Sequence, residues 1–289
     1  MTYTIRPARP EDKAAIAAFA GDTFEWGDYV IEVFDGWVAD PEGMVVVAVD
    51  AEDKAIALSR LGLQSATEAW LQGVRVRPDW RRQGVASALT DHLGRWALEN
   101  GCRVMRLAVE AQNAAGRSQV QRSGFRPVGD WVQATRSIGE ASPVPAGNGG
   151  RRVPAEEQLV PAHSSETVPA FMSWSAGPLA KPTRGLFSVR WMWRRLTESD
   201  LERSARHEAF WMARPGWVVA ARRGDQLEVA WLETREEDAY DLMRALVDLA
   251  SKQEAEGIAV TIPAVGWLTS AARRIGCDLF PVTVYERPL

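Results

Sequence analysis

The chain has 289 residues, of which 46% are hydrophobic and 25% charged, as in a globular protein with one large domain or two ordinary ones. Its net charge of −4 argues against a nucleic-acid-binding protein, which usually carries a basic excess. No apolar run reaches membrane-spanning length, and the first residues lack the apolar core of a signal peptide. Two cysteines give neither a disulfide framework nor a metal-ligand spacing. We therefore expect a cytoplasmic protein with no metal, no membrane and no nucleic-acid partner.

The first 138 residues alternate between strand and helix patterns. The run from Met44 to Val49 is β-branched, which is typical of a buried strand. The stretch from Val85 to Glu99 has the apolar spacing of an amphipathic helix, and Asn100-Gly101 is a common helix end. The patterns predict strands at 4–7, 44–49, 55–63, 69–76, 104–109 and 131–136, and helices at 10–20, 29–38, 85–99 and 114–122.

Residues 139–169 are rich in proline and glycine and poor in large apolar side chains, which predicts a linker or a long exposed connection. Beyond it the patterns predict a hairpin around Gly224-Asp225, helices at 239–256 and 268–275, and strands at 258–262 and 282–285. The stretch 88–104 aligns loosely with 245–260, which favours an internal duplication. An unrelated, smaller α+β domain is the alternative.

The most informative stretch runs from Val74 to Leu89. A strand ends at Val76, and a basic loop of small residues, Arg81 to Ala86, then enters a helix. The free N–H groups and partial positive charge of a helix N-terminus bind anions such as pyrophosphate. Gly84 lets the backbone approach phosphates closely. The loop lacks both the Gly-Lys-Ser/Thr ending of a P-loop and the Gly-x-Gly-x-x-Gly dinucleotide fingerprint.

The pattern Arg81-x-x-Gly84-x-Ala86 resembles the acetyl-CoA signature of the GNAT (GCN5-related N-acetyltransferase) superfamily. Further stretches between residues 3 and 137 also look like that family: Ile5–Asp12, Leu71–Pro78, Leu107–Val109, Asn113 and Ser123–Phe125. The resemblance implies an α/β (α+β) fold with a central mixed, splayed β-sheet flanked by helices. With a related second half, the chain would be a tandem GNAT protein. We expect a GNAT domain at 1–138, the linker at 139–169 and a smaller, degenerate GNAT-like domain at 170–289.

This resemblance also implies acetyl-CoA as co-substrate, bound where the fourth and fifth strands splay apart. The implied coenzyme-binding residues are Val74, Val76, Arg81, Arg82, Gln83, Gly84, Val85, Ala86, Ser87 and Asn113. For Asn113, a helix N-cap is the alternative role. In the second half, the corresponding loop between 232 and 240 is acidic and lacks glycine, so we do not expect it to bind the coenzyme.

The sequence departs from the family at the positions of its usual acid and base. Many relatives carry Glu where this chain has Gln72, and Tyr where it has Val120. Gln72 cannot be a base, although it could orient a water, and Val120 cannot donate a proton. Glu68 and Glu110, near the two ends of the splayed strands, are candidate replacements. For each, a solvated surface carboxylate is the alternative.

Four residues between the first two helices, in a region that usually lines the acceptor pocket in this family, are acidic or aromatic: Glu25, Trp26, Asp28 and Tyr29. Such a lining suits a cationic or aromatic amine, whereas ordinary loop packing is the alternative. The resemblance thus implies transfer of an acetyl group from acetyl-CoA to a primary amine of a small molecule or amino acid. A non-catalytic acyl-CoA-binding sensor and an acetyltransferase acting on a protein partner are the alternatives. The oligomeric state stays open, a homodimer included.

Overall fold

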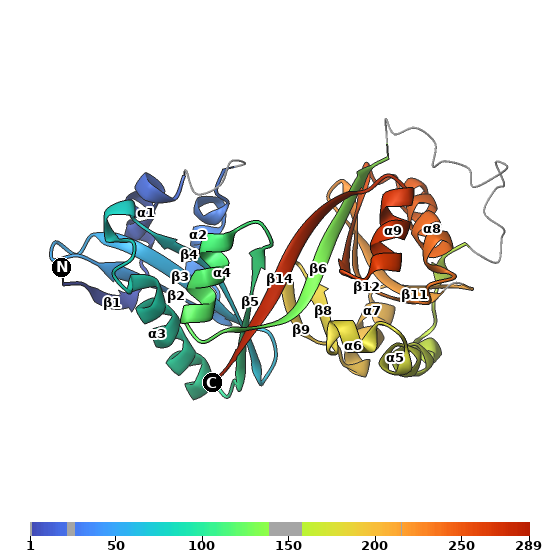
Figure 1. Cartoon of the computed structure of the whole chain (residues 1–289), viewed down its shortest axis with the longest axis horizontal. Coiled ribbons are helices and arrows are strands. Elements are labelled where there is room, and N and C mark those ends of the chain that lie inside the picture. The colour runs from blue at the N-terminus through green and yellow to red at the C-terminus, as the bar shows by residue number, and fades with distance from the viewer. Residues whose placement is uncertain (1, 22–26, 139–157, 215) are drawn as a thin grey trace. The chain divides into compact units, whose positions relative to one another are not determined.

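The computed structural model describes residues 2–21, 27–138, 158–214 and 216–289. The chain divides into two compact units (Figure 1), which are not consecutive in sequence. The first unit contains Met1–Leu107, Ala115–Arg126 and Tyr285–Leu289, and the second contains Ala108–Ala114 and Pro127–Val284. The last residues of the chain therefore complete the first unit, and residues 108–114 belong to the second. A single boundary at residue 138, as predicted from the sequence, does not describe this exchange of segments between the units.

The first unit alternates strands and helices, close to the bounds predicted from the sequence. Its elements, with those that cross into the second unit, are β1 (Thr4–Pro7), η1 (Pro10–Asp12), α1 (Lys13–Ala20), α2 (Val30–Val38), β2 (Gly43–Val49), β3 (Ala55–Leu63), β4 (Glu68–Val76), η2 (Pro78–Trp80), α3 (Val85–Glu99), β5 (Val104–Glu110) and α4 (Ala114–Arg122). Strand β6 (Arg126–Ser137) follows and lies in the second unit apart from its first residue.

The sheet of the first unit has the order β1-β2-β3-β4-β5, antiparallel up to β4 and parallel between β4 and β5. Helices cover both of its faces. Val45 and Val47 of β2 pack with Ile16 of α1 and Phe34 of α2 in one buried cluster. The intervening Val46 is also buried and faces the opposite side, where α3 contacts β2, β3 and β4. This explains why the predicted run at 44–49 is continuously apolar.

Strand β4 carries a bulge at its centre. Arg60 of β3 pairs with Gln72 and Leu58 with Arg75, so β4 contains one more residue than β3 between the two pairs. Gly73 lies in this bulge at a φ of 69°, and a Cβ atom there would come within 2.7 Å of Cζ3 of Trp37. Both the backbone angle and the close approach of the indole therefore require glycine at this position.

The second unit is also a mixed α/β structure. Its elements are β7 (Val160–Pro161), η4 (Ser164–Glu166), α5 (Thr167–Ala176), α6 (Ala180–Thr183), β8 (Leu186–Val189), β9 (Met192–Arg195), α7 (Glu198–Arg206), β10 (Phe210–Ala213), β11 (Gly216–Arg223), β12 (Gln226–Thr234), α8 (Ala239–Lys252), β13 (Gly257–Pro263), α9 (Gly266–Arg274) and β14 (Asp278–Pro288), whose last residues lie in the first unit. Its strands follow the order β14-β6-β13-β12-β11-β10-β7, while β8 and β9 form a separate two-stranded sheet.

The second unit repeats the element order of the first. Strands β11 and β12 are antiparallel, β12 and β13 are parallel and joined by α8, and α9 follows β13. In the first unit, β3, β4, β5, α3 and α4 hold the same places. The shared order supports the internal duplication inferred from the sequence.

The segment 139–169 differs from the predicted linker where the structure describes it. Residues 139–157 lie outside the described residues. From residue 158 onward the chain is built into the second unit, because Val160 and Pro161 pair with β10 and Leu159 is buried. Pro161 is among the residues that predict a linker. It fits an edge strand instead, because one side of such a strand needs no backbone N–H donors.

Candidate functional site

The loop between β4 and α3 forms an anion cradle, defined here as residues Arg82 to Ser87. Arg82 and Gly84 adopt left-handed backbone angles, with φ of 62° and 80°. Within the described part of the chain, none of the N–H groups from Arg82 to Ser87 donates to another protein group, and Ala88 is the first to donate within the helix, to the Gly84 carbonyl at 3.0 Å. Free N–H groups at a helix start, with the positive end of the helix dipole, favour an anion there.

The cradle is open at its centre and held at its sides. A Cβ atom on Gly84 would meet no other atom within 4 Å, so nothing in the described structure fills the space. Gln83 Nε2 donates to the Asp79 carbonyl at 2.9 Å, and Arg81 Nε donates to the Val76 carbonyl at 3.0 Å. On the helix side, the Ser87 hydroxyl lies 3.1 Å from the hydroxyl of Ser123 at the end of α4. These contacts fix the loop without using its backbone donors.

Strands β4 and β5 separate beside this cradle. Their register contains three pairs, the last of which joins Trp70 and Arg106, whereas β4 continues to Val76. Beyond Trp70, Gln72, Val74 and Val76 are half-buried and alternate with the buried Gly73 and Arg75. One face of β4 therefore presents three residues next to a loop that can hold an anion.

This arrangement, a splayed strand pair ending at an anion cradle, agrees with the comparison of the chain with known proteins. Residues 13–125 match the model of the acetyltransferase (GNAT) family. Over this segment the chain is thus similar to members of the GNAT family. The match covers β4, the cradle, β5 and α4.

Relatives and solved structures show the same similarity. An aminoglycoside N(6')-acetyltransferase type 1 of Stenotrophomonas maltophilia is 27% identical over 130 residues, which are 42% of this chain and 85% of that protein. A GCN5-related N-acetyltransferase from Sphaerobacter thermophilus superposes with a TM-score of 0.67 at 14% identity, over 99% of this chain and 95% of that one. A tandem GNAT protein from the clavulanic acid biosynthesis pathway gives a TM-score of 0.58 at 14% identity, over 99% and 98%. The predicted GNAT fold, including its tandem form, is confirmed.

The matched segment brings together most of the predicted coenzyme residues. Val74 and Val76 lie on the splayed strand, and the positions from Arg81 to Ser87 form the loop and the first turn of α3. The Val76 carbonyl already accepts the Arg81 guanidinium, which leaves its second lone pair. Asn113 immediately precedes α4, and its N–H donates to the Glu110 carbonyl at 3.0 Å.

Glu68 lies in an ion pair at the closed end of the β4–β5 pair. Its Oε1 is 2.5 Å from Nη1 of Arg106, and both residues are buried. Arg106 also contacts Glu286 at 3.1 Å. Position 68 is where the two strands pair, not where they separate. The contacts favour a structural role for Glu68 over the role of base suggested by the sequence.

Glu110 is the last residue of β5 and is half-buried. Its Oε2 accepts Nε2 of Gln112 at 3.1 Å, an exposed contact that leaves the other oxygen available for a proton. Glu110 is therefore the better placed of the two carboxylates that the sequence suggested.

Tyr285 is a residue that sequence reasoning missed. Val120, on α4, offers no proton, but the hydroxyl of Tyr285 lies 3.3 Å from Nε of Arg117 on the same helix. Tyr285 is 1% exposed and belongs to the last residues of β14, which complete the first unit. Just beyond β14, the Leu289 N–H donates to the carbonyl of Arg103, the residue before β5. No local signal links residue 285 to α4, since the contact spans 168 positions.

Of the four predicted acceptor residues, the structure describes two, Asp28 and Tyr29. Glu25 and Trp26 lie outside the described residues. Asp28 is buried in an ion pair with Arg75, at 2.5 Å, so its charge is neutralised within the protein. Tyr29 packs edge-on against Trp37, with ring centroids 5.9 Å apart, and burial raises the pKa of its hydroxyl. The contacts of Asp28 and Tyr29 favour loop packing over an acidic lining for a cationic amine.

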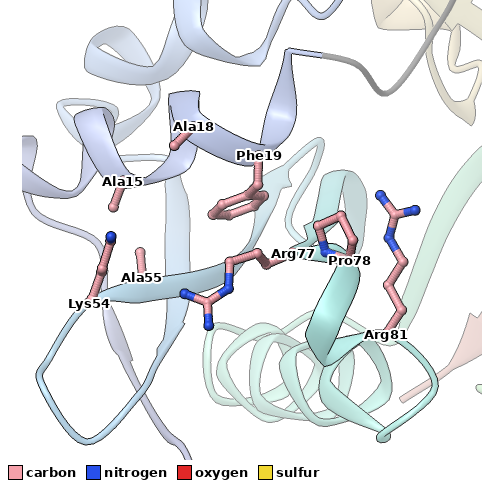
Figure 2. A pocket seen from close by; sticks show the side chains of 8 residues that line it. All are labelled: Ala15, Ala18, Phe19, Lys54, Ala55, Arg77, Pro78 and Arg81. Atoms are coloured by element: carbon pink, nitrogen blue, oxygen red, sulfur yellow. The ribbon is translucent and has the colours of Figure 1, made fainter.

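A cavity of about 330 Å³ adjoins the loop in the first unit (Figure 2). Its lining residues come from α1, the β2–β3 turn, the start of β3 and the segment between β4 and α3: Ala15, Ala18, Phe19, Lys54, Ala55, Arg77, Pro78 and Arg81. Arg77 is neutralised by Asp79 at 2.8 Å. The side chains of Lys54 and Arg81 stand at opposite ends of the view, with Phe19 between them. Among the described residues that line it, the charged side chains are basic and none is a carboxylate.

The equivalent loop of the second unit, between β12 and α8, lacks the features of the cradle. It contains Glu236, Glu237 and Asp238, no glycine, and no left-handed residue. Negative charge at this position would repel a pyrophosphate. Across the described ranges, no group of three or more His, Cys, Asp or Glu side chains could hold a metal ion. Among the same residues, no helix has both the length and the apolar character needed to cross a membrane.

Proposed function

We propose that this protein is an N-acetyltransferase of the GNAT type that moves an acetyl group from acetyl-CoA to a primary amine of a small molecule. The observation that carries the proposal is the anion cradle, whose free N–H groups lie at the end of the splayed strand β4. The match of residues 13–125 to the acetyltransferase family supports the same reaction.

The residues present fit acetyl-CoA. The open space above Gly84 and the free donors from Arg82 to Ser87 suit a pyrophosphate, and Arg81 adds positive charge. The half-buried edge of β4 at Val74 and Val76 offers backbone groups to an extended arm that ends near Gln72. When bound, acetyl-CoA supplies an acetyl group activated as a thioester. The protein holds it at one end and positions the amine at the other.

Proton transfer is assigned to Glu110 and to a water that Gln72 orients. An ammonium group is not a nucleophile, so a base must accept a proton from the amine, and we assign this role to Glu110. The amine nitrogen forms a bond to the acetyl carbon while the carbon–sulfur bond breaks. The released thiolate takes a proton from a water that the Gln72 amide orients, and that water regains a proton from the acylated nitrogen, which becomes the neutral amide. Tyr285 is the second candidate for that donor, because its hydroxyl lies against α4.

A small-molecule acceptor is supported by the relatives. The protein from Stenotrophomonas maltophilia is an aminoglycoside acetyltransferase. The match to this chain covers 85% of that protein's length. At 27% identity this supports an amine acceptor without defining which amine. We propose an acceptor from the wider class of small amines, amino sugars included.

A non-catalytic acyl-CoA sensor is the second candidate function. It is favoured by one observation, the amide of Gln72 at the position where many relatives carry a carboxylate. A sensor needs the cradle but no base, so Glu110 would then have no effect on any reaction.

The test is release of free thiol from acetyl-CoA with a panel of amines, amino acids and amino sugars. The proposal expects acceptor-dependent release with at least one class of small amine. Tight binding of acetyl-CoA without release for any acceptor would support the sensor instead. Release with a protein acceptor alone would overturn the small-molecule assignment.

A further inference from the structure

The hairpin of β8 and β9 holds an exposed tryptophan in an unfavourable backbone conformation. The two turn residues, Arg190 and Trp191, have φ of 52° and 64°. Left-handed angles at consecutive positions are typical of Asn-Gly or Gly-Gly turns and are disfavoured for residues that carry a Cβ atom. Nevertheless the indole of Trp191 is 40% exposed. The turn therefore presents a large aromatic ring to the surface at a cost in backbone energy, which points to a role outside packing.

The exposed indole is held in place by other aromatic rings. Trp191 meets Phe280 of β14 edge-on, with ring centroids 6.0 Å apart, and meets Trp193 at the same separation. Trp193 is 1% exposed and contacts Trp131 of β6 at 5.8 Å. Because the inner rings are buried, the outer ring has a fixed orientation and can receive a ligand without first being ordered. We name Trp191 and Phe280 the aromatic wall.

The aromatic wall lies close to the end of β5. Pro281, next to Phe280 in the chain, accepts a hydrogen bond from the N–H of Ala111 at 3.0 Å. Ala111 directly follows Glu110, the residue to which we assign the role of base. All of these residues belong to the second unit. A carboxylate and an exposed aromatic surface thus lie within a short span of adjoining chain.

We infer that the aromatic wall binds the acceptor, and that the acceptor is an amine carried on a ring. This inference rests on the proposed function and specifies its substrate class. The flat face of an indole packs against the C–H face of a sugar or against another aromatic ring, and its π system attracts an ammonium group. Glu110, in the adjoining stretch of chain, is then the residue that takes the proton of the amine. An open-chain amine offers no ring to the wall and gains little from it.

The experiment is calorimetric titration of the full chain with coenzyme A present, using glucosamine and tyramine as ring-bearing amines and putrescine as the open-chain amine. The variants are W191A and W191G, of which the glycine form also fits the left-handed turn. W191F keeps a ring, and R190A is the matched control at the neighbouring left-handed position. Circular dichroism of each variant confirms that the fold is retained.

We expect W191A and W191G to bind at least one ring-bearing amine about tenfold more weakly than the wild type. W191F and R190A should stay within about threefold of it, and putrescine should bind all five proteins alike. Equal affinity of the wild type and W191G for every ring-bearing amine would overturn the inference. Failure of both ring-bearing amines to bind the wild type would overturn it as well.

The titration separates this inference from the proposed function. If ring-bearing amines bind through Trp191 but no thiol is released, the acetyltransferase function fails while the aromatic wall stands as a binding site. If thiol is released with amines whose binding does not depend on Trp191, the enzyme function stands and the wall is excluded.

Discussion

The guanidinium of Arg75 and the carboxylate of Asp28 form an ion pair that is shielded from solvent on both sides. The distances are 2.5 Å from Nε to Oδ2 and 3.1 Å from Nη2 to Oδ1, and the side chains are 8% and 0% exposed. Oδ1 also accepts the N–H of Val30 at 2.9 Å, at the start of α2. One carboxylate therefore joins α2 to β4 next to the bulge at Gly73.

Replacing Asp28 with Asn should destabilise the protein substantially. The variant keeps the shape of the side chain but removes the buried negative charge that faces the guanidinium of Arg75. Breaking a buried ion pair in this way costs about 3–5 kcal/mol in the free energy of unfolding, to be measured by urea denaturation. Asp53→Asn is the matched control, because Asp53 is paired with Arg6 but is 57% exposed. A loss for Asp28→Asn no larger than for the control would contradict the proposed importance of this pair.

Replacing Glu110 with Gln should remove the base while preserving the coenzyme site. General-base catalysis contributes about 10²–10⁴ in rate, so kcat should fall by that factor while acetyl-CoA affinity stays unchanged. Glu99→Gln, at the exposed end of α3, serves as the control carboxylate. Steady-state kinetics with a saturating acceptor make the comparison. A kcat within about twofold of the wild type would exclude Glu110 as the base.

Glu233 in the second unit should make stability depend on pH. Burial raises the pKa of its carboxyl, while the Ser173 hydroxyl, donating at 2.8 Å, acts in the opposite direction. The folded protein therefore binds this proton more tightly than the unfolded chain. Stability should decrease as pH rises from about 4.5, the ordinary value, through the raised folded value, and remain lower above it.

Glu233→Gln tests this dependence, because the amide oxygen can still accept the Ser173 hydroxyl but cannot ionise. The variant should be more stable than the wild type at neutral pH and should lose the decrease between acidic and neutral conditions. Thermal unfolding across that range gives the comparison. Glu228→Gln on the same strand, where the side chain is 44% exposed, is the control. Parallel pH profiles for the wild type and Glu233→Gln would show that Glu233 does not carry the dependence.

The sequence predicted the elements whose signals are local. Helix α3 was predicted from its apolar spacing and its end at Asn100-Gly101, and the cradle was predicted from Gly84 and the basic residues before it. The left-handed angle of Gly84 agrees with the residue type, but that of Arg82 could not be read from an arginine. The helix starting at 239 was predicted to continue to 256 and ends at Lys252, because Glu254 turns into the left-handed region.

Features that depend on distant residues were not predicted. Asp28 looked available to a substrate because its partner, Arg75, lies 47 positions away. The exchange that brings Tyr285 to the first unit is set by strand pairing and leaves no trace in the local pattern. Strands β8 and β9 have four residues each, too few to show an alternation, and Pro169 within α5 resembled a break. Proline fits there because it lies in the first turn of the helix.

The central claim, that acetyl-CoA binds at the cradle, is tested most directly by calorimetric titration of acetyl-CoA into Gly84→Glu and its matched control, Gly224→Glu. Both glycines have positive φ, 80° and 56°, and neither position has another atom within 4 Å of an added Cβ. The two variants therefore introduce similar backbone strain and the same charge, but only one lies in the cradle. We predict that Gly84→Glu abolishes binding while Gly224→Glu binds as the wild type does. Equal affinity of the two variants for acetyl-CoA would contradict the assignment of the site.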